Sequence, residues 1–135
     1  MTHLLDTNSC IVFLRQGTSS ILAKRLAAAK PGSVVLCSIV VAELFYGARR
    51  SNQTTKNLAG VNAFCEAFVS LPFDDSAADQ YGLIRDHLVA QGMPIGPNDL
   101  LIASIAAANR LALVTHNVAE FRRVPGLVVE DWQVE

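Results

Sequence analysis

A continuous apolar run flanked by serines, SVVLCS at residues 33–38, constrains the fold of this chain more than any other feature. Such a run, with no polar residue inside it, is typical of a strand that is covered on both faces. Sheets covered on both faces are usually parallel, because the connections between parallel strands place helices on each side. The run therefore predicts a central parallel sheet between helices.

Short apolar runs alternate with helical patterns along the rest of the chain. Further strands are predicted at 3–5, 70–73, 111–115 and 127–131. Helices are predicted at 7–17, 18–32, 38–50, 54–70 and 75–92, and the segment 93–110 is predicted to turn through Pro94, Gly96 and Pro97 into a last, strongly apolar helix. This alternation predicts an α/β fold, with a central, mostly parallel sheet of about five short strands and helices on both faces.

The length and composition predict one domain that spans residues 1–135. Apolar residues make up 51% of the chain and charged residues 17%, and no repeat or linker divides it. The three cysteines have no metal-type spacing and lie among apolar residues, so we expect buried, reduced thiols. Trp132 is expected to pack and hold the C-terminus. No leader and no apolar run of roughly 18 residues is present, so we expect a soluble, cytoplasmic protein.

The first candidate site residue is Asp6, which directly follows the predicted strand 3–5 in HLLDTN. Asp6 suits the N-cap of the next helix, a contribution of about 1 kcal/mol. It equally suits a ligand at the carboxyl end of a parallel strand, where α/β sheets bind their ligands. The two roles are compatible, because Thr7 and Asn8 can begin the helix while Asp6 faces the site, with Asn8 in support.

Glu43 is the second candidate, because its neighbours in IVVAELFYG are apolar on nearly all sides of the predicted helix. A narrow solvated edge of the helix would account for it. An ionised carboxylate in apolar surroundings otherwise requires a cation or hydrogen-bond donors. Glu43 therefore has a structural and a functional interpretation.

Three further polar residues also have both interpretations. Asp99 in GPNDLLIAS lies in the first turn of an apolar helix, where an acid interacts favourably with the helix dipole. Asn117 and Glu120 in VTHNVAEF suit a turn or cap residue and an ordinary helical acid. Asn117 follows the predicted strand 111–115 by two residues, so the fold places it at the same edge of the sheet as Asp6.

The combination of these residues points to chemistry more strongly than any one of them. Several carboxylates within a few ångströms would repel one another unless cations lay between them. Oxygen ligands without clustered histidine or thiolate suit Mg²⁺ or Mn²⁺, which bridge phosphate oxygens and activate water. The net charge of −1 is compatible with a nucleic-acid substrate, since acids gathered at one site would mask a basic remainder.

Four ordered motifs carry a resemblance that covers essentially the whole chain. LLDTN, VAELFYGARR, GMPIGPNDLLIASIA and LVTHNVAEFRRVPGLVVEDW resemble the PIN-domain ribonucleases. More narrowly, they resemble the VapC-type toxins of bacterial VapBC toxin–antitoxin pairs. The resemblance implies the three-layer PIN fold, a Mg²⁺-dependent endoribonuclease, an RNA substrate with transfer RNA among the candidates, a VapB-like antitoxin and a homodimer.

The resemblance also implies roles for particular residues. The metal ligands of the family fall on Asp6, Glu43 and Asp99. The fourth family position, often aspartate, falls on Asn117, so the site would rely on Glu120 or on waters to hold a second metal. Thr115 would be the small hydroxyl residue that supports the site.

Basic residues and one histidine have weaker claims to a role. Arg49 with Arg50, and Arg122 with Arg123, form two pairs near predicted element ends. They are either solvated surface or phosphate contacts that flank the cleft. His116 is a candidate general base, although the alternation of the peptide directs it away from its neighbours.

Two other functions compete with the nuclease. A strand that ends in Asp also opens aspartyl-phosphate phosphotransferases, but these usually have a second Asp where this chain has Asn8. A PIN fold that has lost its chemistry and acts as an RNA- or partner-binding regulator is the main alternative. The presence of all three core acids favours the enzyme.

Overall fold

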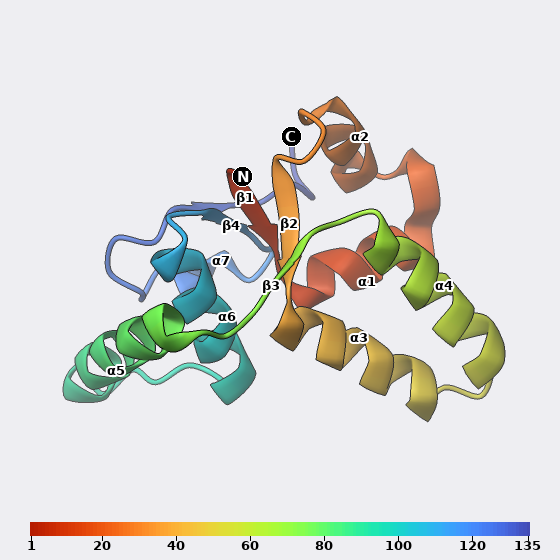
Figure 1. Cartoon of the computed structure of the whole chain (residues 1–135). Helices are drawn as coiled ribbons and strands as arrows, with labels where there is room; N and C mark the ends of the chain where they lie inside the picture. The colour runs from red at the N-terminus through yellow and green to blue at the C-terminus, as the bar shows by residue number, and fades with distance from the viewer.

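The computed structural model describes all 135 residues, and its centre is a five-stranded sheet in the order β3-β2-β1-β4-β5 (Figure 1). The strands are β1 (His3–Leu5), β2 (Val34–Cys37), β3 (Ser70–Leu71), β4 (Ala112–Val114) and β5 (Val129–Glu130). Every pairing in the sheet is parallel. In the central pairings, Leu4 of β1 lies opposite Val35 on one side and Leu113 on the other. The predicted parallel α/β sheet is confirmed.

Helices cover both faces of this sheet. They are α1 (Thr7–Gln16), the short 3-10 helix η1 (Gly17–Ser19), α2 (Ile21–Ala28), α3 (Ser38–Arg50), α4 (Thr54–Glu66), α5 (Asp75–Ala90), α6 (Pro97–Ala108) and α7 (Val118–Phe121). Figure 1 shows α1 to α4 on one side of the strands and α5 to α7 on the other. The strand order explains this division. The chain passes from β1 through β2 to β3 in one direction and then from β3 to β4 and β5 in the other, and right-handed crossovers of opposite direction place their helices on opposite faces.

The core explains why these short strands are stable. All four residues of β2 are buried, as the unbroken apolar run predicted. Helix α6 buries six residues, and the hydroxyl of one of them, Ser104, donates to the Leu100 carbonyl at 2.7 Å and so needs no outside partner. The buried apolar residues form one cluster that includes both layers of helices and the sheet.

Several element boundaries differ from the prediction. The helix predicted from residue 18 begins at Ile21, because Ser20 accepts a hydrogen bond from the Ala23 N–H at 3.1 Å and caps it there. The helix predicted to reach residue 70 ends at Glu66, because Ser70 pairs with Leu36 as part of β3. Helix α6 begins at Pro97, at the end of the predicted turn, since proline suits the first helical turn. The short helix α7 was not predicted, because four residues carry no helical periodicity.

The remaining expectations about composition can be compared with the structure directly. Cys10 and Cys37 are buried, Cys65 is partly buried, and all three are free thiols, as expected. None of the helices combines the length and the apolarity that a membrane crossing requires.

The C-terminal segment is held to the sheet through Trp132, which is buried as expected. Its ring packs against that of His3 in a tilted arrangement, with centroids 5.1 Å apart and an interplanar angle of 49°. The indole N–H donates to one carboxylate oxygen of Glu130 at 3.0 Å, and the His3 Nε2 donates to the other at 3.0 Å. Hydrogen bonds from Trp132 and His3 hold the pKa of Glu130 below its usual value.

The variant Trp132→Phe is expected to destabilise the protein by about 1–2 kcal/mol near pH 7, because it removes a charge-assisted hydrogen bond and part of a ring. A carboxylate with a lowered pKa stabilises the fold at neutral pH, and this contribution is lost as pH falls through its folded-state pKa. The loss should therefore shrink as the pH falls into the acid range in which folded Glu130 takes up its proton, where only the packing defect remains. Urea unfolding across this range measures it, and a loss independent of pH would contradict the role of Glu130.

Candidate active site

The candidate site lies at the carboxyl ends of β1 and β4, where the connections leaving the sheet turn to opposite faces. This is the topological switch point at which open α/β sheets bind ligands. Asp6 follows β1 and Thr115 follows β4, and the Asp6 N–H donates to the Val114 carbonyl at 3.0 Å. Helices α3 and α6, which belong to opposite layers, are in contact there (Figure 1).

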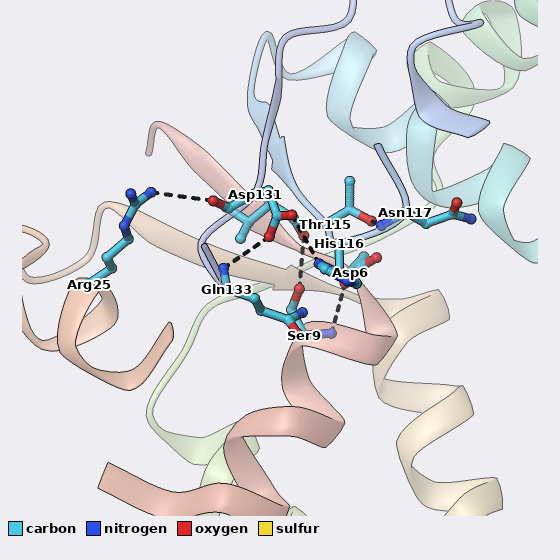
Figure 2. Close-up of polar contacts among 9 residues, drawn as sticks. Asp6, Ser9, Arg25, Thr115, His116, Asn117, Asp131 and Gln133 are labelled. Carbon is cyan, nitrogen blue, oxygen red and sulfur yellow. Dashed lines mark hydrogen bonds and ion pairs between the residues drawn. The ribbon is translucent and has the colours of Figure 1, made fainter. Parts of the chain in front are cut away.

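Asp6 is both a helix cap and a site residue. The residue is only 4% exposed, and its carboxylate accepts a hydrogen bond from the Ser9 N–H at 2.8 Å, which makes Asp6 the N-cap of α1 (Figure 2). Burial raises the pKa of Asp6, and the charge of Glu43 raises it further, against hydrogen bonds from Thr115 and Ser9 that lower it. The two roles that the sequence left open therefore coincide.

Asp6 opens onto a cleft of about 660 Å³ between the beginnings of α1 and α6 and one face of α3. Glu43 and Asp99 line the same cleft, so the structure brings together the three acids that the sequence placed in separate segments. The other lining residues are Thr7, Asn8, Ile11, Ile39, Ala42, Tyr46 and Asn98. The predicted supporting residue Asn8 is thus at the cleft.

Glu43 is oriented by a residue that the sequence did not single out. The Thr7 hydroxyl donates to its Oε1 at 2.7 Å and so links the start of α1 to the middle of α3. Glu43 is partly buried, as expected for an acid among apolar neighbours. A hydroxyl one residue after a predicted ligand is a weak signal, because only the tertiary fold shows which acid it meets.

Asp99 is the acid whose protonation the site perturbs most. Burial raises its pKa to about 7, together with the nearby charges of Glu120, Asp6 and Glu43. The Glu120 carboxylate is held close to it, because its Oε1 accepts a hydrogen bond from the Gly96 N–H at 3.0 Å. Burial is the largest cause of this raised pKa, and the negative charges of the neighbouring acids add to it.

Asn117 and Glu120 form a second group beside Asp99 and do not line the cleft itself. The Asn117 side-chain amide donates to Glu120 Oε2, while its backbone N–H donates to the Thr115 hydroxyl at 3.0 Å. Thr115 is completely buried and also hydrogen-bonds Asp6. Thr115 therefore connects this second group to Asp6.

The side chains that line the cleft have the chemistry to bind a hard cation, although they are not arranged as a preformed metal centre. No three His, Cys, Asp or Glu side chains are arranged to hold a metal ion. All the polar donors that line the cleft are oxygens or amides, the ligands that Mg²⁺ and Mn²⁺ prefer over softer metals. Burial raises the pKa values of both Asp6 and Asp99, and the charges of neighbouring acids raise them further.

The remaining candidates lie outside the cleft. His116 donates through Nδ1 to Asp131 at 2.9 Å, as Figure 2 shows, so it is directed at the C-terminal segment. Arg49 and Arg50 are exposed at the end of α3. Arg122 and Arg123 follow α7 and are also exposed, and Arg123 donates to the Pro94 carbonyl at 3.2 Å.

Comparison with known proteins finds relatives along the whole chain. The PIN domain family matches residues 3–127. Ribonuclease VapC2 of Rickettsia felis is 36% identical over 98% of each chain, and the tRNA(fMet)-specific endonuclease VapC of Shigella flexneri is 38% identical over 98% of each chain.

Solved structures resemble the whole fold. VapBC2 from Rickettsia felis, bound to a DNA fragment from its promoter, has a TM-score of 0.92 at 35% identity, covering 98% of this chain and 99% of the other. DNA-bound VapBC from Salmonella typhimurium has a TM-score of 0.92 at 36% identity and covers 98% of each chain. The predicted three-layer fold is that of these structures.

The variant Asp99→Asn tests the charge accumulation. A carboxyl whose pKa is raised on folding binds more protons in the folded than in the unfolded state, so stability falls as pH rises between about 4 and 7. The free energy of unfolding of the variant should equal that of the parent near pH 4 and exceed it near pH 8 by about 1 kcal/mol, a figure reduced because Asp99 is partly exposed. Urea unfolding in EDTA measures this.

The control for this measurement is Asp86→Asn, which removes an exposed acid from α5. We expect no pH-dependent gain from it. A stability difference for Asp99→Asn that stays constant from pH 4 to pH 8 would contradict the raised pKa of Asp99.

Proposed function

The chain belongs to the PIN-domain family and, within it, to the VapC proteins, and from this premise we propose that it is a metal-dependent endoribonuclease that acts as the toxin of a toxin–antitoxin pair. The observation that carries the proposal is the convergence of Asp6, Glu43 and Asp99 on one cleft at the switch point of the sheet. Relatives over the full length are named as ribonucleases, which supports RNA as the substrate.

Asp6, Glu43 and Asp99 are the residues that would hold Mg²⁺, or Mn²⁺ in its place. When bound, such a cation polarises a phosphate and lowers the pKa of a coordinated water, so that hydrolysis leaves 5′-phosphate and 3′-hydroxyl ends. Hydrogen bonds within the chain orient these acids. Ser9 and Thr115 hold Asp6, and Thr7 holds Glu43.

Glu120 supplies the fourth negative charge of the site in this proposal. Asn117 stands where the family often has an acid, and its amide donates to Glu120 instead of adding a charge. An aspartate at 117 would repel Glu120, whereas the amide orients it beside Asp99. The number of cations that the site takes then depends on Glu120.

Partners follow from the same relatives. The similar solved structures from Rickettsia felis and Salmonella typhimurium are VapBC complexes, so we expect a cognate VapB-like antitoxin that silences the toxin at its cleft. We also expect a homodimer. The Shigella flexneri relative is named for cleavage of tRNA(fMet), which makes transfer RNA the first substrate to test, with inhibition of translation and growth as the outcome.

The alternative is a catalytically inactive regulator that binds RNA or a protein partner through the same fold. Three acids line the cleft, and the pKa of Asp99 is raised to about 7, so their ionised forms destabilise the fold. Binding alone would not require such an arrangement. The enzyme is therefore favoured, and the two functions separate cleanly by experiment.

The variant Asp6→Asn should lose RNA cleavage by about 100-fold or more, because a site that loses a ligand loses several kcal/mol of transition-state stabilisation. It should stay folded, since asparagine caps helices as well as aspartate does and keeps an oxygen for the Ser9 N–H. End-mapping of cleaved RNA and growth after brief expression measure the loss. Asp86→Asn is the matched control, and a folded Asp6→Asn protein that cleaves like the parent would overturn the assignment.

Chelation tests the cation requirement separately. EDTA should abolish cleavage, and excess Mg²⁺ or Mn²⁺ should restore it, because only oxygen-rich ligands surround the cleft. Mg²⁺ should also raise the unfolding temperature of the parent and not that of Asp6→Asn, since a ligand that binds only the folded state stabilises it. Cleavage that persists in EDTA would rule out this mechanism.

A further inference from the structure

Besides its acids, the cleft is lined by an exposed tyrosine of α3 and by asparagines in the first turns of α1 and α6. We propose that Tyr46, Asn8 and Asn98 form a nucleobase subsite, in which an unpaired base stacks on the Tyr46 ring and presents its edge to the two amides. The inference rests on the proposed ribonuclease function and extends it, because it assigns residues that select the nucleotide beside the scissile phosphate.

Tyr46 is placed for a ligand and not for packing. Its side chain is 68% exposed, yet it lines the cleft. It lies three residues after Glu43 on α3, a spacing that puts both side chains on the same face of the helix. Tyr81, by contrast, packs edge-to-face against Phe73 and lies under the guanidinium of Arg85.

The surroundings of Tyr46 match the two surfaces of a base. Ala42 and Ile39, one and two turns before it on α3, add apolar surface to the lining of the cleft. Asn8 and Asn98 are exposed in the first turns of α1 and α6 and also line the cleft. An amide both donates and accepts hydrogen bonds, as the edge of a base requires.

The position of this group beside the acids favours RNA as its ligand. Aromatic rings bind unstacked bases of single-stranded RNA, and this stacking tolerates any base because each has a π-face. Bases inside a duplex have both faces covered by their neighbours, so the subsite requires a loop or a single strand. A base on Tyr46 would place its own phosphate near Glu43, Asp6 and Asp99.

Affinity for single-stranded RNA, measured in EDTA with labelled octamers, separates this subsite from cleavage. Tyr46→Ala should weaken binding by about 5- to 100-fold, the loss expected for one stacked base. Tyr46→Phe keeps the ring and should stay within about twofold of the parent. Leu83→Ala is the matched control, because Leu83 is similarly exposed, at 66%, on α5 and away from the cleft.

An abasic nucleotide, moved along the octamer, identifies the stacked position. An abasic nucleotide at that position should weaken binding to the parent by the same factor as the Tyr46→Ala substitution does. It should not weaken binding to Tyr46→Ala any further, because the two changes remove one and the same interaction. Asn8→Ala and Asn98→Ala should alter the ranking of the four homopolymers, whereas Tyr46→Ala should weaken all four. A blunt-ended RNA duplex, which has no unpaired base, should bind to the parent and to Tyr46→Ala with the same affinity.

Two results would overturn the subsite. One is a Tyr46→Ala protein that binds RNA as the parent does, and the other is an abasic effect that simply adds to that of Tyr46→Ala. If the parent meanwhile binds and cleaves RNA, only the subsite fails and the ribonuclease stands. A parent that neither binds nor cleaves RNA would refute the ribonuclease, and the subsite with it.

Discussion

The burial of one carboxylate, Asp6, at the end of the central strand is the constraint on which the rest of this structure depends. Strand β1 pairs with β2 and β4, so its last residue emerges at the middle of the sheet edge and not at its margin. Ser9 and Thr115 hold the carboxylate in that position. Because β1 is central, helices from both layers converge on Asp6 and bring Glu43 and Asp99 with them.

This convergence concentrates negative charge, and the protein tolerates the charge only in part. Asp99 shows the consequence, since burial and its acidic neighbours raise its pKa to about 7. Glu120 stays close because Gly96 and Asn117 donate to it. Because the ionised acids are destabilised at this site, a cation that bound there would stabilise them, and the proposed nuclease chemistry would use that cation.

Much of the fold could be predicted from local sequence patterns. The unbroken run at β2 predicted a buried parallel strand, and the alternation of strands with helices predicted both covering layers. The boundary at Ile21 was not predicted, because a cap shifts a helix start without changing its apolar pattern. Helix α7 has too few residues for any periodicity to show.

The candidate site divides in the same way. The sequence by itself determined which acids were anomalous, because an ionised Glu43 among apolar neighbours and an Asp6 at a strand end are visible without coordinates. Only the tertiary structure decided three further features. Thr7 donates a hydrogen bond to Glu43, the charge of Glu120 raises the pKa of Asp99, and Tyr46 lines the same cleft. These contacts join residues far apart in the chain, or depend on which helix face turns inward. Packing sets both, and no local pattern encodes them.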